Sequence, residues 1–122
     1  MSVVLLRHAS AGDRVEWTGD DRRRPLDKKG WKQARRLVDE LRELGVRRVL
    51  SSPYDRCVQT VEPLAEELGV AIEIDDRLAE GAGRDAALEL LGGLEDVVAC
   101  THGDIVDEVL GRPLKKGQYS LL

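Results

Sequence analysis

Short apolar runs alternate along this chain with longer segments in which every third or fourth residue is apolar. Val3–Leu6 is continuously apolar, Val46–Leu50 is apolar except for two arginines, Asp96–Thr101 is apolar between its two end residues, and Val70–Ile74 has its larger apolar side chains at alternate positions. Runs of this length predict β-strands, and continuous runs are typical of strands buried on both faces. The segment Gln118–Leu122 predicts a last strand at the edge of the sheet.

The first longer segment has the spacing of an amphipathic helix. Asp27 is a favourable N-cap residue, and Gly45 is a typical helix terminator. Between them, apolar residues recur at helical spacing: Trp31, Ala34, Leu37, Val38, Leu41 and Leu44. The sequence therefore predicts one long helix with a single buried face.

Three further helices follow. One is expected over Tyr54–Leu68, after Ser51-Ser52-Pro53, and Gly69 should end it. Pro63 lies inside that range, which predicts a kink or a break into two helices. Arg84–Leu91 and Asp104–Leu110 are predicted to form two shorter helices.

Strands and helices thus alternate, with a polar loop over residues 11–25 after the first strand. Helix-length connections between strands require a mainly parallel sheet with helices on both faces. We therefore expect a three-layer α/β/α sandwich. At 122 residues, with no repeat or linker, the chain is expected to form a single domain over residues 1–122.

The composition excludes several functional classes. A net charge of −4 gives no general reason to expect nucleic acid or an anionic membrane as a partner. No segment approaches the roughly 20 apolar residues of a membrane span, and the first residues lack the features of a signal peptide. The expected location is cytoplasmic.

The two cysteines do not indicate a metal site or a nucleophile. Cys57 and Cys100 are far apart, and the two histidines do not complete a zinc-ligand pattern. A cysteine phosphatase needs an arginine six residues after its nucleophile, but Pro63 occupies that position relative to Cys57. We expect reduced, partly buried thiols, no metal and no cofactor.

The candidate chemistry lies where strands end. His8 follows the first strand, Ser51-Ser52 ends the second, and His102 follows the strand that ends at Thr101. In open α/β sheets, ligands bind beyond the carboxyl ends of the strands. Arg7 stands beside His8. An imidazole can attack phosphorus, and guanidinium groups can neutralise phosphoryl oxygens, so this edge predicts a phosphoryl-binding site.

Four segments in order resemble the signatures of the histidine phosphatase superfamily, also called phosphoglycerate mutase-like. The resemblance runs from Val3 to about Val106, and the short chain is most similar to the compact SixA-type phosphohistidine phosphatases and to the phosphatase-like domain appended to some Nudix hydrolases. The segments are Arg7-His8-Ala9, Ser52-x-x-x-Arg56-x-x-x-Thr60, Leu78-x-Glu80 and His102-Gly103, and the Nudix-linked similarity adds Thr18-Gly19-Asp20-Asp21 and Arg24-Pro25-Leu26-Asp27-Lys28.

The resemblance implies a phosphoglycerate mutase-like fold and a role for each matching residue. His8 would be the nucleophile and would form a phosphohistidine. Arg7, Arg56 and His102 would hold the phosphoryl oxygens, and Gly103 would let the backbone approach them.

The general acid is the least specific assignment. The family places an acidic residue soon after the third strand, which corresponds to Glu80. Asp104 is the alternative acid, although we expect it mainly to cap the last helix.

The resulting expectation is a metal-independent phosphatase that hydrolyses phosphomonoesters or phosphohistidine. A nucleotide or small-metabolite phosphatase of the same family is one alternative, and a non-catalytic phosphate-binding domain is another. Only about 20 residues separate Glu80 from His102, which leaves little chain for a lid and argues against mutase activity. We expect an open site rimmed by Arg22-Arg23-Arg24 and suited to a large substrate, such as a protein phosphohistidine. The oligomeric state stays open.

Overall fold

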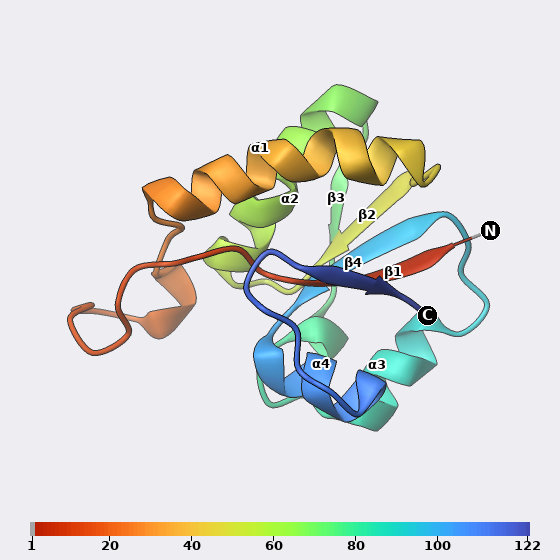
Figure 1. Cartoon of the computed structure of the whole chain (residues 1–122). Coiled ribbons are helices and arrows are strands. Elements are labelled where there is room, and N and C mark those ends of the chain that lie inside the picture. The colour runs from red at the N-terminus through yellow and green to blue at the C-terminus, as the bar shows by residue number, and fades with distance from the viewer. Residues whose placement is uncertain (1) are drawn as a thin grey trace.

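The computed structural model describes residues 2–122 and shows a central sheet with helices on both faces (Figure 1). The strands are β1 (Val3–Arg7), β2 (Arg48–Ser51), β3 (Ile72–Ile74), β4 (Val97–Thr101) and β5 (Tyr119–Leu121). The helices are α1 (Lys28–Glu43), α2 (Asp55–Leu68), α3 (Arg84–Leu91) and α4 (Gly103–Leu110), and two short 3₁₀ helices span Asp21–Arg23 and Asp76–Leu78. The three-layer α/β/α arrangement expected from the sequence is confirmed.

The sheet has the order β3-β2-β4-β1-β5. Strands β1 to β4 are all parallel to one another, and β5 pairs antiparallel with β1 at the edge of the sheet. Parallel pairing places Leu6 opposite Cys100 and Arg7 opposite Thr101. The residues that follow β1 and β4, His8 and His102, therefore leave the sheet side by side.

Each face of the sheet has its own hydrophobic cluster. Helices α1 and α2 cover one face and α3 and α4 cover the other (Figure 1). The first cluster joins sheet residues such as Leu6 and Val49 to Leu37 of α1 and Leu64 of α2. The second joins sheet residues such as Leu5 to Leu91 of α3 and Val106 of α4. These two layers fix the strand ends that carry the candidate site.

Helix α1 begins and ends as its sequence predicts. The Asp27 carboxylate accepts a hydrogen bond from the backbone N–H of Gly30 at 2.8 Å. At the other end, Gly45 adopts a positive φ of 80°, and Val46 N–H donates to the carbonyl of Leu41 at 3.3 Å. This is a Schellman cap.

The Schellman caps explain why two strands are shorter than predicted. The sequence predicts strands that start at Val46 and Val70, but each of these residues completes the cap of the preceding helix. Val70 N–H donates to the carbonyl of Ala65 at 3.1 Å. The strands therefore start only at Arg48 and Ile72. Of the two outcomes predicted at Pro63, a kink or a break into two helices, the break is wrong, because α2 continues through Pro63 as one helix.

The expected cap at Asp104 is also wrong. The N-cap of α4 is His102, and Asp104 lies in the first turn of that helix.

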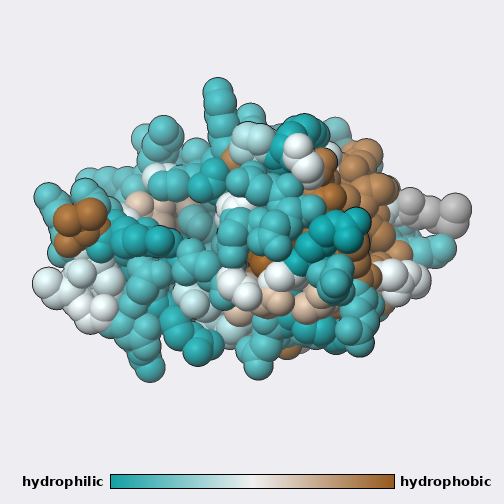
Figure 2. All heavy atoms as spheres, turned by 90° about the horizontal axis from the view of Figure 1, so that it is seen from below, coloured by the Kyte–Doolittle hydropathy of each residue, from teal (hydrophilic) through white to brown (hydrophobic). Residues whose placement is uncertain are grey.

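The surface seen from below is largely hydrophilic, with hydrophobic side chains gathered toward the end opposite the 11–25 loop (Figure 2). Within residues 2–122, no helix is both long and apolar enough to cross a membrane.

Candidate active site

Four polar side chains converge beyond the carboxyl ends of β1 and β4. The His8 and His102 rings lie edge to face with centroids 5.5 Å apart. Arg7 ends β1, and its guanidinium would lie 3.1 Å from a Cβ at position 103, so any side chain there would crowd this approach. Arg56 lies in the first turn of α2, close enough for its charge to act on His8.

His8 is held in one tautomer by its neighbour. Its Nδ1 lies 2.8 Å from the carbonyl oxygen of Ala9, and because a carbonyl only accepts, Nδ1 carries the proton. The other ring nitrogen, Nε2, then presents a lone pair. Burial lowers the pKa of His8 from 6.5 to about 3, helped by the positive charges of the site and opposed by the Ala9 hydrogen bond. His8 is therefore neutral at physiological pH.

His102 is buried and oriented by Ser52. The Ser52 hydroxyl lies 2.8 Å from His102 Nε2 and also accepts from the backbone N–H of Tyr54 at 3.3 Å. The Ser52 hydroxyl can donate to Nε2 while it accepts from Tyr54, and on this arrangement we assign the proton of His102 to Nδ1. That Nδ1 is buried and has no hydrogen-bond partner among the described residues.

The Arg56 side chain is fully buried and is anchored by Asp21. Its Nη1 donates to the carbonyl of Asp21 at 2.8 Å, and its Nη2 donates to the Asp21 carboxylate at 3.2 Å. The Tyr54 ring lies 4.8 Å from the guanidinium carbon. Arg56 Nε has no partner within residues 2–122.

The Arg7 guanidinium is likewise held by a backbone carbonyl and has a buried nitrogen without a partner. Its Nη1 donates to the carbonyl of Leu114 at 2.7 Å, and its Nε is buried without a partner in the described part of the chain. Arg7, Arg56 and His102 thus each bring one buried nitrogen without a partner to the surroundings of His8, and with the proton of His102 on Nδ1 all three are N–H donors. Leaving a buried donor unpaired costs roughly 1–3 kcal/mol, so three together indicate a site built for an acceptor-rich ligand such as a phosphoryl group.

Glu80 lies at the rim of this site, where its carboxylate contacts two arginines. One oxygen accepts from Arg14 Nη2 at 2.9 Å, and the other lies 3.8 Å from Arg56 Nη2. The Glu80 side chain is about one-third exposed. Asp104 is close in the fold, since one of its oxygens accepts from the N–H of Gly81 at 2.8 Å and the other is buried without a partner among residues 2–122. Both acidic candidates therefore border the site.

Of the three consecutive arginines that the sequence predicts at an exposed rim, only Arg22 and Arg23 are exposed. Arg24 is buried, because it donates to the carboxylate of Asp21 at 2.9 Å and to the carbonyl of Gly12. Arg22 and Arg23 are exposed, and Arg22 lies over the Tyr54 ring at 5.2 Å. Arg24 instead holds the loop that surrounds the site.

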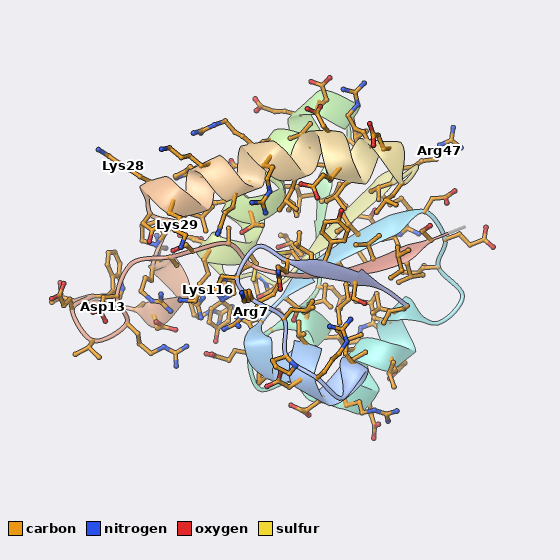
Figure 3. The ribbon with its side chains drawn as sticks, viewed as in Figure 1. Arg7, Asp13, Lys28, Lys29, Arg47 and Lys116 are labelled. Carbon is orange, nitrogen blue, oxygen red and sulfur yellow. The ribbon has the colours of Figure 1, made fainter. Side chains whose placement is uncertain are left out.

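A cavity of about 460 Å³ opens beside His8. Besides Arg7 and His8, its lining comes from the loop, as Ala11, Gly12, Asp13, Arg14 and Arg24, and from Lys116. Arg7, Asp13 and Lys116 are labelled in Figure 3, at the same end of the molecule. The cavity is predominantly basic and open to solvent.

Sequence reasoning missed the residues that orient the site. Thr60, the last residue of the second motif, accepts from the Ala9 N–H at 2.9 Å and donates to the Arg56 carbonyl at 2.6 Å. Asp21 anchors Arg56, and Ser52 orients His102. Thr60 and Ser52 were visible as motif positions, whereas the role of Asp21 depends on how the loop folds back.

The remaining groups of the site do not suggest a metal centre. Cys57 and Cys100 are free and fully buried, and Cys57 Sγ lies 3.6 Å from His102 Nε2. Over residues 2–122, no three His, Cys, Asp or Glu side chains form a group that could hold a metal ion.

A family model described as "Histidine phosphatase superfamily (branch 1)" matches residues 3–89. Among curated proteins, the 8-oxo-(d)GTP phosphatase of Mycolicibacterium smegmatis is 39% identical over 112 residues, which cover 86% of this chain and 35% of that protein. The chain therefore spans about a third of the length of this relative.

Solved structures share the fold. A SixA protein from Agrobacterium tumefaciens superposes with a TM-score of 0.83 at 22% identity, covering 99% of this chain and 90% of that chain. The protein histidine phosphatase SixA complexed with tungstate gives a TM-score of 0.76 at 23% identity, with 100% of this chain and 94% of that chain covered.

Proposed function

The chain belongs to branch 1 of the histidine phosphatase superfamily, and we propose that its site hydrolyses phosphorylated substrates through a phosphohistidine formed at His8. The observation that carries the proposal is the group of three buried nitrogens without hydrogen-bond partners, Arg7 Nε, Arg56 Nε and His102 Nδ1, around a neutral imidazole. A phosphoryl group supplies the oxygen acceptors that these donors lack.

Binding needs little rearrangement of the protein. Arg56 is already fixed by Asp21, Arg7 by the carbonyl of Leu114, and His102 by Ser52. Donors held in place before the reaction stabilise developing charge without reorganising, which is the main electrostatic contribution to phosphoryl transfer. The two arginines also neutralise the negative charge that would repel a nucleophile.

The first step transfers the phosphoryl group to His8. The Nε2 lone pair forms a bond to phosphorus while the bond from phosphorus to the leaving oxygen, or nitrogen, breaks. A carboxylic acid donates a proton to the leaving atom. We assign this role to Glu80, with Asp104 as the alternative, because both carboxyl groups border the site.

The second step restores the enzyme. Water attacks the phosphorus of phosphohistidine, the N–P bond breaks, and the carboxylate that donated the proton takes one from the water. Orthophosphate leaves and His8 is again neutral. Arg7, Arg56 and His102 hold the same three oxygens through both steps.

The substrate is proposed as a phosphomonoester or a phosphohistidine in the cytoplasm. The open cavity and the partly exposed Glu80 side chain allow a leaving group to extend into solvent, which suits a large substrate. A nucleotide is the second candidate, favoured by the name of the 39% identical relative, an 8-oxo-(d)GTP phosphatase.

The test is turnover of p-nitrophenyl phosphate between pH 5 and pH 8, followed by a screen of nucleotides, phosphorylated metabolites and a phosphohistidine protein. We expect hydrolysis that survives excess EDTA and is inhibited by tungstate or vanadate. Activity lost with EDTA and restored by a divalent ion would contradict the mechanism. Tight tungstate binding without turnover of any substrate would instead support a non-catalytic phosphate-binding domain.

A further inference from the structure

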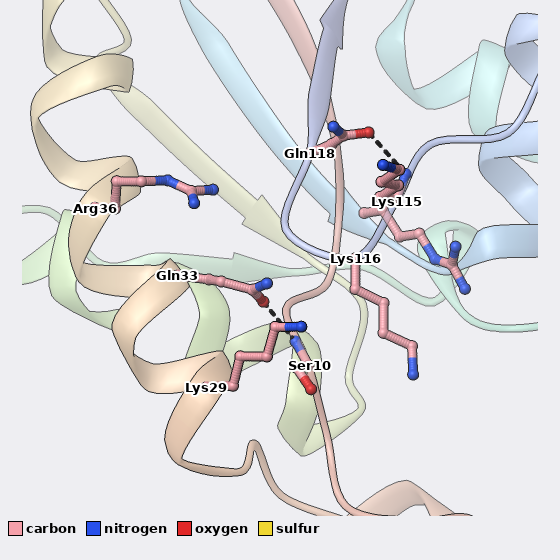
Figure 4. A pocket seen from close by; sticks show the side chains of 8 residues that line it. Ser10, Lys29, Gln33, Arg36, Lys115, Lys116 and Gln118 are labelled. Carbon is pink, nitrogen blue, oxygen red and sulfur yellow. Dashed lines mark hydrogen bonds between the residues drawn. The ribbon is translucent and has the colours of Figure 1, made fainter.

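A second basic cavity of about 540 Å³ adjoins the phosphoryl site (Figure 4). It lies between the first half of α1 and the turn that precedes β5, and its lining residues are Arg7, Ser10, Lys29, Gln33, Arg36, Lys115, Lys116 and Gln118. Arg7 and Lys116 also line the cavity beside His8, so the two spaces are neighbours. The proposed mechanism uses none of the other six residues.

The charge of this second cavity is unusual for the chain. The protein carries a net charge of −4 and has only five lysines, yet Lys29, Lys115 and Lys116 all line this space. None of the three makes an ion pair or a side-chain hydrogen bond within residues 2–122. Figure 3 shows Lys29 and Lys116 near Arg7.

Two carboxylates oppose these cations. Asp27 lies close enough for Lys116 and Lys29 to help lower its pKa, but its carboxylate already accepts from Gly30 N–H and from the Ser10 hydroxyl. Glu40 pairs with Arg36 at 3.2 Å. The three lysines therefore keep most of their charge available to a ligand.

The turn that carries Lys115 and Lys116 is fixed to the active-site backbone. Gly117 N–H lies 3.1 Å from the Arg7 carbonyl and 3.0 Å from the His8 carbonyl. Gly117 has a φ of 78° and packs against Gln33, where a Cβ would lie 3.1 Å from the Gln33 carboxamide. The two lysines are therefore held at the site rather than placed at random on a surface loop.

Two side-chain amides add hydrogen-bond donors to the cavity. The Gln33 oxygen accepts from Ser10 N–H at 2.8 Å, and the Gln118 oxygen accepts from Lys115 N–H at 2.9 Å (Figure 4). Each amide nitrogen is left without a partner among the described residues. Ammonium groups and amide N–H groups in one cavity match the oxygens of a phosphate.

We propose that this cavity is a second anion subsite that binds a further phosphate of the substrate, so that the chain prefers substrates with a phosphate chain, such as nucleoside diphosphates or triphosphates, over simple monoesters. Arg7 and Lys116, which border both cavities, contact the phosphate groups between the two subsites. This inference rests on the proposed function, because it names the substrate class for the same site.

The experiment compares how tightly inorganic tripolyphosphate and orthophosphate bind to variants of the cavity lysines and to a control variant outside the cavity. Lys29→Gln and Lys115→Gln, singly and together, remove charge from the second cavity alone. Lys28→Gln removes the same charge from the adjacent exposed position of α1, which does not line the cavity. Binding is measured by calorimetry in the His8→Ala background, where tripolyphosphate is not consumed, and inhibition of p-nitrophenyl phosphate turnover is measured with His8 present.

The proposal expects tripolyphosphate to bind at least about ten-fold more tightly than orthophosphate when all lysines are present. The double variant should lose most of that advantage, whereas orthophosphate affinity and turnover of p-nitrophenyl phosphate stay within about two-fold. Lys28→Gln should keep the full advantage. This pattern would establish a local subsite rather than a general effect of charge.

Other patterns would overturn the proposal. Equal losses in Lys28→Gln and Lys29→Gln would show diffuse attraction, and orthophosphate binding without any gain for tripolyphosphate would remove the second subsite while leaving the proposed function intact. Failure of both anions to bind would contradict the proposed function as well. If the double variant slows turnover of a phosphohistidine protein and leaves tripolyphosphate affinity unchanged, the cavity recognises an acidic protein surface instead.

Discussion

His8 Nδ1 lies 2.8 Å from the carbonyl oxygen of Ala9, the residue that follows it in the chain. This single contact fixes the proton on Nδ1 and leaves Nε2 as the free lone pair. Thr60 stabilises the arrangement, because its hydroxyl accepts the Ala9 N–H at 2.9 Å. The tautomer needed for attack through Nε2 is therefore set by backbone geometry and not by a neighbouring carboxylate.

Replacing His8 tests the proposed nucleophile. His8→Ala should lower kcat by at least about 1,000-fold, since the covalent route is lost, while Arg7, Arg56 and His102 still bind phosphate. Rapid quench of the wild-type protein should trap acid-labile, base-stable phosphate, and the variant should trap none. Undiminished turnover in His8→Ala would exclude the assignment.

The low pKa of His8 predicts how stability depends on pH. Its pKa is about 3 in the folded protein and about 6.5 in the unfolded chain. Between these values the unfolded chain binds more protons, so this group's contribution to stability is complete above pH 6.5 and declines as the pH falls toward 3. At pH 4.5 the loss should be about 3 kcal/mol relative to pH 7.5.

The measurement is the free energy of urea unfolding of wild type and His8→Gln at pH 7.5 and pH 4.5. Glutamine does not titrate, so the stability difference between the two proteins should shift in favour of the variant on acidification. The variant serves as the control for carboxylates such as Asp21 and Asp27, whose lowered pKa values also weaken the fold in acid. Parallel pH dependence in both proteins would show that His8 is not buried in its neutral form.

The fold could be predicted because its signals are local. Helical spacing, Asp27 as an N-cap and glycine terminators determine the elements, and their alternation determines a parallel sheet. Errors occurred where a β-branched residue had a second role: Val46 and Val70 cap helices instead of starting strands. Local sequence cannot distinguish these roles, because both place an apolar residue just after a glycine.

The site was predictable only in part. His8 and His102 follow strands, so topology brings them together, and the structure places Arg7 and Arg56 beside them. The contacts of Arg56 with Asp21 and of Arg24 with Gly12 depend on the path of the 11–25 loop, which has no periodic pattern. Arg24 was for that reason wrongly expected at an exposed rim.

Gly30 is predicted to be essential for stability although it lies inside a helix. An alanine normally favours a helix by about 1 kcal/mol over glycine. At this position, however, a Cβ would lie 1.9 Å from the carbonyl oxygen of Ser10, so the chain beside the active site would have to move. We expect Gly30→Ala to destabilise the protein by roughly 2 kcal/mol or more.

Gly12→Ala is the matched control for that substitution. Gly12 lies in the loop just after Ser10, and apart from Gly12 and its two chain neighbours no described residue has an atom within 4 Å of the position that a Cβ would take there. Thermal unfolding should show a loss of several degrees for Gly30→Ala and little change for Gly12→Ala. A stabilised Gly30→Ala protein would mean that Ser10 and α1 are not packed as described.

The last prediction separates the two candidate acids. Glu80→Gln keeps the shape of the side chain but cannot donate a proton, so it should lower kcat on a poor leaving group, such as an alkyl phosphate, by about 100-fold or more. Its effect on p-nitrophenyl phosphate should be far smaller, because p-nitrophenolate leaves without protonation.

Asp104→Asn should affect both substrates about equally, since the Asp104 carboxylate holds Gly81 N–H at 2.8 Å and thereby positions the neighbouring Glu80. The ratio of kcat on the two substrates, measured for each variant, therefore reports proton donation independently of folding or positioning. A leaving-group dependence that appears in Asp104→Asn and not in Glu80→Gln would transfer the role of acid to Asp104.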